Sequence, residues 1–428
     1  MPILTFNHEP DDLKSYTRGS VAVSIFEQFP GHFTPVATEG AAWRASRKSI
    51  QPIFAVKSFQ DHLVSAMDEI VPTCLSLLRN VAKNNVALDW NDLAGRIALS
   101  IFCKTAFDVD TRMLREDVRC LDEQDVFIGA VLELNEISAA RLFNPYWSLT
   151  ERFDGTKSHF DKNISRLWAA IEALIAEHSD RKRSQDNLNE KTDFLTSLIQ
   201  GHFEENPVFL RNIMVTLLFG GRDNTQNSIS WAMYELSRHP QWLTRMRKEA
   251  KELDKAGSMP TFANVSSYIV HLAVFYETLR LWPGLPKNAR YAIVDDVLPA
   301  VPDFGLPEVP ISKGTYVLWS DRIIMRDPTV YGEDATEFNP GRHISPEGKF
   351  IKPSLPEFIS FGAGPRYCPA ATIVPYEWVC IWSALLRDFD FEALDLSERT
   401  VGDTLTNQME KPFMVRVRPL DKQEQLEY

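Results

Sequence analysis

The order of apolar and polar residues along the chain predicts a protein built mainly from helices. Pro72 should kink or divide the first long helix, and Pro240 should stop the longest one. A predicted cap at Asp89 leads into a core helix that ends near Phe107. Apolar residues at helical spacing predict helices over residues 63–81, 97–107, 127–137, 167–178, 207–239, 241–253 and 276–282, and from Cys368 to Leu386.

The last third of the chain is rich in proline and predicts loops and short strands. Residues 316–319 form a short run of β-branched, aromatic and other apolar residues that predicts a strand, and residues 415–418 alternate between apolar and polar side chains, as strands do. The fold class is therefore mainly α with small β-sheets. A length of 428 residues suffices for two domains or for one large helical unit.

Composition narrows the range of functions. The formal net charge of −12 argues against a nucleic-acid partner, and 44% apolar residues allow a sizeable core. Five cysteines without metal-finger spacing argue against a disulfide framework and favour a reducing compartment. No apolar run reaches transmembrane length, and the N-terminus has no signal-peptide pattern.

The most informative stretch is a Gly/Pro-rich loop that ends in a cysteine, residues 361–370. Cys368 at the start of the following helix would be close to backbone N–H groups, which favour a thiolate. Gly362 and Gly364 allow a flat ligand to approach, Phe361 can lie against its apolar face, and Arg366 can reach an anionic group. These features suit the proximal side of a haem. The alternative is a buried structural cysteine in a surface turn.

This loop resembles the haem-binding signature of the cytochrome P-450 superfamily, Phe-Gly-x-Gly-x-Arg-x-Cys followed by a small residue two places on. Every fixed position is present. The resemblance implies a helical core shaped like a triangular prism. Haem b would lie between a long kinked helix and the cysteine loop, with Cys368 as the axial iron ligand. The local sequence motifs resemble those of eukaryotic microsomal members, and most of all those of fungal long-chain hydroxylases and biosynthetic enzymes. The chain would be one domain, 1–428, that begins after the family's membrane anchor and first sheet elements.

The resemblance also assigns residues that hold the cofactor. Trp43 and Arg47 are four apart, so on a helix they share a face, and the family's Trp-x-x-x-Arg directs both to a haem propionate. Arg290 and Arg366 match further propionate ligands, and Phe361 would contact the ring. The alternatives are a basic surface helix with one packed tryptophan, and a surface arginine at 290.

A second signal lies inside the long helix, Phe219-Gly220-Gly221-Arg222-Asp223-Asn224-Thr225. Two adjacent glycines cost roughly 1 kcal/mol each in a helix, which a ligand's approach would justify. It resembles the family's Ala/Gly-Gly-x-Asp/Glu-Thr, which forms the oxygen groove. Asp223 would then be the acid of the proton path, while Asn224 occupies the alcohol position. Thr225 lies about 100° further around the helix. The resemblance places the substrate pocket at Phe219, Gly220, Leu285 and Pro286.

A third motif is structural in the family. Glu277 and Arg280 are three apart and share a helix face. Arg342, in Phe338-Asn339-Pro340-Gly341-Arg342, matches the third member of a buried network, with Gly341 where glutamate is frequent. We expect these charges to hold the core around the cysteine loop, because buried charges are costly unless they are paired. The alternative is a solvated surface pair.

Together these resemblances imply a haem-thiolate monooxygenase. By the resemblance it would take electrons from NADPH through a reductase, with cytochrome b5 as a second donor, and hydroxylate or epoxidise an apolar, fatty-acid-like or secondary-metabolite substrate. Arg44, Arg47 and Lys48 form a basic patch, and the resemblance implies that such a patch meets an acidic electron donor. A monomer is expected at the surface of the endoplasmic reticulum, or otherwise in the cytoplasm. Asn224 leaves open an isomerase or dehydratase that does not use dioxygen, and the shortened start leaves open a truncated haem-binding protein with little activity.

Overall fold

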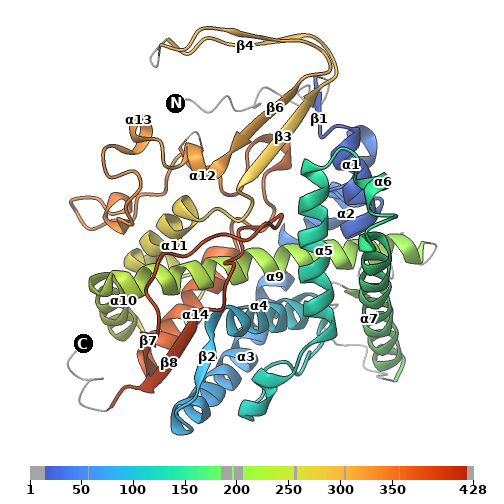
Figure 1. Ribbon diagram of the computed structural model, residues 1–428. Helices are drawn as coiled ribbons and strands as arrows, with labels where there is room; N and C mark the ends of the chain where they lie inside the picture. Colours follow the sequence, from blue (N-terminus) through green and yellow to red (C-terminus); the bar gives the residue numbers. More distant parts are fainter. Residues whose placement is uncertain are drawn as a thin grey trace.

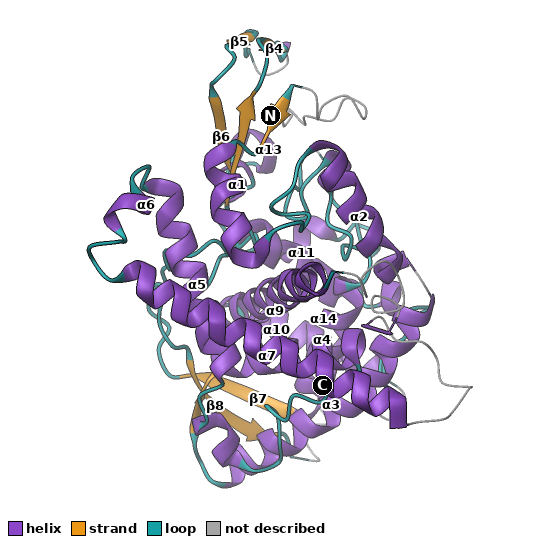
Figure 2. Cartoon of the chain, turned by 90° about the vertical axis from the view of Figure 1, so that its right-hand side faces the viewer, coloured by secondary structure: helices purple, strands orange, loops and turns teal. Residues whose placement is uncertain are grey.

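The computed structural model describes residues 15–55, 57–184, 195–196, 206–254, 258–302, 305–355 and 357–421. Within these ranges helices form most of the structure and the sheets are small, as predicted (Figure 1, Figure 2). None of the helices in them has the length and apolar character needed to cross a lipid bilayer.

The helices of the first half follow local signals in the sequence. Asp89 caps α4 as predicted, by accepting a hydrogen bond from the N–H of Asn91 at 3.0 Å. Pro72 lies inside α3 without dividing it. The helices are α1 (Ser20–Phe26), α2 (Gly40–Ala55), α3 (Lys57–Lys83), α4 (Trp90–Phe107), α5 (Val126–Phe143), α6 (Trp147–Thr150) and α7 (Thr156–Ser184).

The longest helix, α9 (Pro207–Arg238), crosses the middle of the molecule (Figure 1) and is surrounded by other helices when seen from the side (Figure 2). Asn206 caps it, and Pro240 begins α10 directly after it. The helix continues through Gly220 and Gly221 without a break, although a kink was expected there. The other helices are α10 (Pro240–Leu253), α11 (Ile269–Leu281), α12 (Asp321–Ile324), α13 (Pro328–Tyr331) and α14 (Val374–Asp388).

Among the described residues, three small antiparallel sheets lie around this helical core. The first pairs β1 (Tyr16–Thr17) with β3 (Lys287–Ala292) and β3 with β6 (Tyr316–Ser320). The second pairs β8 (Met414–Pro419) with β2 (Ala87–Asp89) on one side and β7 (Phe389–Ala393) on the other. The third is the ribbon of β4 (Asp296–Leu298) and β5 (Val309–Ile311), which extends from the body (Figure 1). The predicted strands at 316–319 and 415–418 are β6 and β8.

A column of aromatic rings connects the centre of the core to the cysteine loop. The rings of Trp90 and Trp382 lie 6.0 Å apart, and Trp382 lies 5.5 Å from Trp378. Phe275 of α11 continues the column, 5.4 Å from Trp378 and 6.5 Å from Phe361. Phe361, the first residue of the cysteine loop, is therefore packed against aromatic rings of the core, which restrict how the loop can move.

Candidate active site

The cysteine loop is closed on itself before α14 begins. The N–H of Cys368 donates to the carbonyl of Phe361 at 2.9 Å. Gly362 and Gly364 have φ values of 71° and 66°, a left-handed conformation that favours glycine. α14 begins only at Val374, six residues after Cys368, so the prediction that the cysteine starts a helix is wrong.

Local N–H groups take the place of a helix terminus near the sulfur. The backbone N–H groups of Ala370 and Ala371 lie close enough to the Cys368 sulfur to favour its anionic form, and the N–H of Ala371 donates to the carbonyl of Cys368 at 3.4 Å. Burial raises the pKa of the Cys368 thiol, while these two N–H groups and the charge of Arg47 oppose that rise. Arg47 lies close by because its Nη2 donates to the carbonyl of Tyr367 at 2.5 Å. The loop therefore places N–H groups and a positive charge near the sulfur, which partly offset the cost of burying its anionic form.

The helix α2 turns Trp43 and Arg47 toward this loop, as their four-residue spacing predicts. The guanidinium of Arg366 lies 4.7 Å from the centre of the Trp43 ring. Arg366 also donates to the carboxylate of Glu39 at 2.6 Å and to the carbonyls of Pro35 and Thr38, both at 3.1 Å. Trp43 is therefore packed beneath the arginine of the loop.

Arg366 belongs to a cluster of arginines with little negative charge. Three of these arginines are Arg18, Arg290 and Arg366. Among the described residues, Glu39 is the carboxylate whose negative charge stabilises the charged form of all three. Burial, and then the charges of Arg366 and Arg290, lower the pKa of Arg18 to about 9. The charge of Asp321 also stabilises the charged form of Arg290. Burial raises the pKa of the Asp321 carboxyl to about 7, however, so this carboxyl is only partly ionised near neutral pH. Arg18 Nε is buried without a hydrogen-bond partner among the described residues. The cluster therefore has an excess of positive charge.

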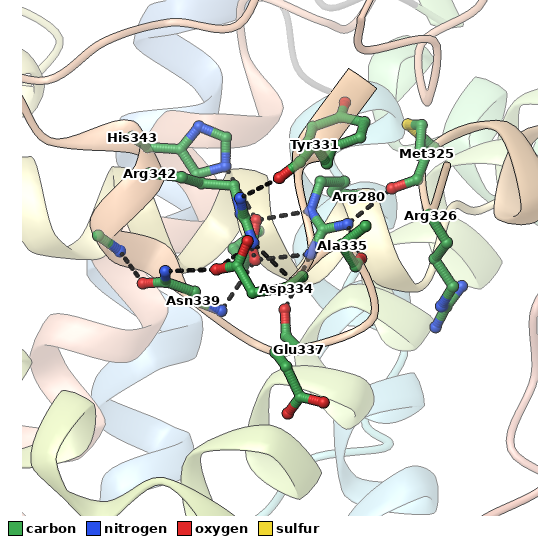
Figure 3. A network of polar contacts seen from close by, with 12 residues as sticks. Arg280, Met325, Arg326, Tyr331, Asp334, Ala335, Glu337, Asn339, Arg342 and His343 are labelled. Atoms are coloured by element: carbon green, nitrogen blue, oxygen red, sulfur yellow. Dashed lines mark hydrogen bonds and ion pairs between the residues drawn. The ribbon is translucent and has the colours of Figure 1, made fainter. Parts of the chain in front are cut away.

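The structure brings Glu277, Arg280 and Arg342 together and adds His343 to them (Figure 3). Arg280 donates to both oxygens of Glu277 at 2.8 Å, and Arg342 Nε donates to Oε1 at 3.0 Å. His343 Nε2 lies 3.1 Å from Glu277 Oε2. Burial alone would raise the pKa of Glu277, but the hydrogen bonds from Arg280 and His343 outweigh it and lower that pKa to about 2.

On α9, Asp223 is fully buried and both of its oxygens are occupied. Arg222 Nη1 lies 2.5 Å from its Oδ1. Its Oδ2 accepts hydrogen bonds from Asn135 of α5 at 2.9 Å, Gln408 at 2.9 Å and Thr406 at 3.2 Å. The carboxylate therefore ties α5 and the segment 404–408 to α9, a connection that the motif alone does not reveal.

The two adjacent glycines have different surroundings. A Cβ on Gly220 would meet no atom within 4 Å, whereas one on Gly221 would lie 2.3 Å from the Phe102 ring of α4. Only Gly220 therefore borders open space, and Gly221 allows two helices to pack closely. Asn224 is four residues after Gly220 and shares its face, and its Nδ2 donates to the carbonyl of Gly220 at 3.3 Å. Thr225 is only 3% exposed and shares the face of Gly221.

The predicted pocket residues are only partly brought together. Phe219 packs edge-on against Phe29, with 5.3 Å between the ring centres. Leu285 is 46% exposed, while Pro286 is buried and its carbonyl accepts hydrogen bonds from Ser320 Oγ and the N–H of Asp321. A cavity of about 870 Å³ lies elsewhere, between α5, α9 and residues 402–412. None of the predicted site residues, all of which are described, lines that cavity.

Comparison with known proteins decides the family. The profile of the cytochrome P450 family matches residues 7–416 of the chain. The chain belongs to the cytochrome P450 family. A cytochrome P450 monooxygenase of Mycosarcoma maydis is 28% identical over 410 residues, which are 89% of this chain and 61% of that protein. Cytochrome P450 52A10 of Candida maltosa is 33% identical over 375 residues, 84% of this chain and 69% of its own length. The chain thus spans less than two thirds of the Mycosarcoma protein.

Membership of the P450 family implies a haem-thiolate cofactor and a redox partner. The residues of this P450 fit such a cofactor. Haem carries two propionate groups, and the cluster of Arg18, Arg290 and Arg366 has more positive charge than Glu39 balances. Buried charges are costly unless paired, so a dianion suits this place. The sulfur of Cys368, with two N–H groups and the charge of Arg47 favouring its anionic form, is a suitable ligand for iron.

Sequence reasoning missed three residues of this region of the P450: Arg18, Glu39 and His343. Arg18 and Glu39 meet because the N–H of Arg18 donates to Glu39 Oε1 at 2.9 Å across 21 residues of chain. No local pattern predicts that contact. His343 follows Arg342 in the same helical turn, so its place next to a predicted network residue was the available signal.

Proposed function

We propose that this P450 is a haem-thiolate monooxygenase that hydroxylates or epoxidises an apolar small molecule, either fatty-acid-like or a secondary metabolite. The observation that carries the proposal is the sulfur of Cys368. It lies near two backbone N–H groups that favour its anionic form, in the same loop as Arg366, a member of a cation cluster that lacks counter-charge. Family membership and the monooxygenase of Mycosarcoma maydis support the proposal.

Each part of the site would hold a different part of the cofactor. Cys368 would ligate the iron, and Phe361 would lie against the ring. The propionates would be bound by guanidinium groups from four separate segments of the chain, together with the indole N–H of Trp43, since these donors suit carboxylates. The guanidinium groups are those of Arg18, Arg47, Arg290 and Arg366.

When bound, the haem would supply the activation of dioxygen with two electrons that come from NADPH through a reductase. The chain's own residues would position and protect the reactants. The amide of Asn224 lies beside the open space at Gly220, where the hydrogen that Nδ2 does not donate to the Gly220 carbonyl would be available to orient a reactant or a water molecule. Phe29 and Phe219 would help to exclude water from the apolar pocket. Glu277, Arg280 and Arg342 would hold the core around the cysteine loop.

The proposal extends to partners and location, which surface features support. The basic patch of Arg44, Arg47 and Lys48 on α2 would meet NADPH–cytochrome P450 reductase and cytochrome b5. Phe143, Tyr146 and Phe153, between 70% and 83% exposed, would rest on the surface of the endoplasmic reticulum membrane. The chain would work as a monomer and as a single domain.

The test is the purified full chain expressed with haem. A thiolate-type reduced carbon-monoxide difference spectrum is expected, followed by spin-state shifts in a screen of fatty acids and other apolar compounds. With a reductase, substrate turnover should consume NADPH and dioxygen in step. Haem binding with no turnover of any compound would instead identify a haem-binding protein with little activity, and the absence of a thiolate-type spectrum would refute the proposal.

A second candidate is favoured by one specific feature. The polar side chain that shares the open face of Gly220 is the amide of Asn224, while Asp223 and Thr225 are buried on other faces of α9. An amide cannot relay a proton as a hydroxyl does. An isomerase or dehydratase acting on a peroxide needs no such relay. Conversion of a lipid peroxide in the absence of NADPH and dioxygen would establish this second function.

A further inference from the structure

The side chain of Asn224 fits against Gly284 only because residue 284 has no side chain. Gly284 lies between α11 and the predicted pocket residues Leu285 and Pro286. A Cβ on Gly284 would lie 2.2 Å from Asn224 Oδ1 and 3.0 Å from its Cγ. Asn224 Oδ1 is buried there without a hydrogen-bond partner among the described residues. The amide oxygen of Asn224 therefore rests against the bare backbone of Gly284.

The backbone at Gly284 is held in place on both sides. Its carbonyl accepts a hydrogen bond from the N–H of Asn407 at 3.0 Å, and the carbonyl of Asn407 accepts one from Trp231 Nε1 of α9 at 2.7 Å. Two residues before Gly284, Trp282 is stacked on Trp231, with 3.6 Å between the ring centres and 3° between the planes. The segment therefore cannot retreat from α9 without breaking these contacts.

The side chain of Asn224 is the weaker partner in this pair. Its hydrogen bond to the carbonyl of Gly220, at 3.3 Å, is long. The space beside Gly220 is open, since a Cβ there would meet no atom within 4 Å. A methyl group added at Gly284 would therefore displace the amide of Asn224 toward that open space, because a flexible side chain yields before an anchored backbone does.

We propose that Gly284 is a positioning residue that sets the direction of the Asn224 amide. With glycine at 284, Oδ1 lies against the backbone and Nδ2 points back to Gly220. A larger residue at 284 would push the amide donor of Asn224 into the open space beside Gly220. The role of the amide toward a bound ligand rests on the proposed function, whereas the contact between Gly284 and Asn224 does not.

Carbon monoxide on the reduced holoprotein is the first probe. G284A should slow carbon-monoxide dissociation by about two- to tenfold, because the displaced amide adds a hydrogen-bond donor near the ligand. In the N224A background the same substitution should leave the rate unchanged. G220A is the matched control, since it adds a methyl group on the open side without touching the amide. Its effect should be equal in both backgrounds.

Side-chain amide resonances provide a second probe that needs no haem. In protein labelled with ¹⁵N-asparagine, the Asn224 signals are identified by their loss in N224A. G284A should shift them further than G220A does. Unmoved Asn224 signals in G284A, or a change in carbon-monoxide dissociation that is the same in both backgrounds, would overturn the proposal. If the wild type forms no carbon-monoxide complex, the proposed function fails, and the resonances still decide the role of Gly284.

Discussion

Replacing Glu277 by glutamine tests how strongly the buried network stabilises the protein around the cysteine loop. The pKa of Glu277 is lowered from its ordinary 4.5 to about 2. Each pKa unit corresponds to about 1.4 kcal/mol, so the ionised carboxylate contributes about 3 kcal/mol to the free energy of unfolding at neutral pH. Glutamine keeps one acceptor oxygen and places an NH₂ group against the donors of Arg280 and His343. Breaking a buried pair in this way costs about 3–5 kcal/mol.

The effect should extend to the cofactor because the network is joined to the loop. Ser360 Oγ donates to the carbonyl of Leu279 in α11 at 2.6 Å, and the Tyr276 ring lies 5.2 Å from Phe358. We therefore expect Glu277→Gln to lower both the urea midpoint of unfolding and the haem content per chain. Glu392→Gln is the control. The side chains of Glu392 and Arg416 are 65% and 44% exposed, so their ion pair should contribute less than about 1 kcal/mol to the free energy of unfolding.

The dependence on pH has a defined sign. Since the pKa of Glu277 is lower in the folded state, its contribution is present above about pH 4.5 and is lost as the pH falls toward 2. Wild type should therefore lose stability across this window more steeply than Glu277→Gln. If Glu277→Gln matches Glu392→Gln in unfolding midpoint and haem content, Glu277 does not hold the core.

Other changes test the remaining parts of the site. Cys368→Ser should abolish the thiolate-type carbon-monoxide spectrum, and an unchanged spectrum would exclude Cys368 as the ligand. Arg18→Ala should accelerate haem transfer to an acceptor protein by about tenfold, because a charged hydrogen bond is lost, while an equal rate would remove Arg18 from the site. Gly221→Ala should cost about 1–3 kcal/mol against the Phe102 ring, whereas Gly220→Ala should be neutral or gain up to about 1 kcal/mol of helix propensity. Equal unfolding midpoints for these two variants would contradict the packing described for α9.

Much of the fold could be predicted because its signals are local. Asp89 and Pro240 mark helix ends through their own side chains, and apolar spacing alone located α3, α9 and α10. The start of α14 could not be located, because the residues after Cys368 are as apolar as the helix itself. Their turns are set by backbone hydrogen bonds of the loop, including those from Cys368 N–H to the carbonyl of Phe361 and from Ala371 N–H to the carbonyl of Cys368.

In the candidate site, too, contacts between residues close in sequence could be predicted, whereas contacts between distant residues could not. Glu277 and Arg280 could be paired because three residues on a helix fix their distance. Glu39 and Arg366 are 327 residues apart in sequence, so only the folded chain brings them together. Gly220 and Gly221 are indistinguishable in the sequence. Their roles separate only when α4 places Phe102 against one of them.

The geometry of α9 explains how one short stretch can serve several elements at once. Successive helical residues point about 100° apart, so Asp223, Asn224 and Thr225 face three directions. Asp223 holds α5 and the segment 404–408, Asn224 rests on Gly284, and Thr225 shares the side of Gly221, which packs on α4. A change of side chain at 224 can therefore alter the donor beside Gly220 without loosening the bonds of Asp223.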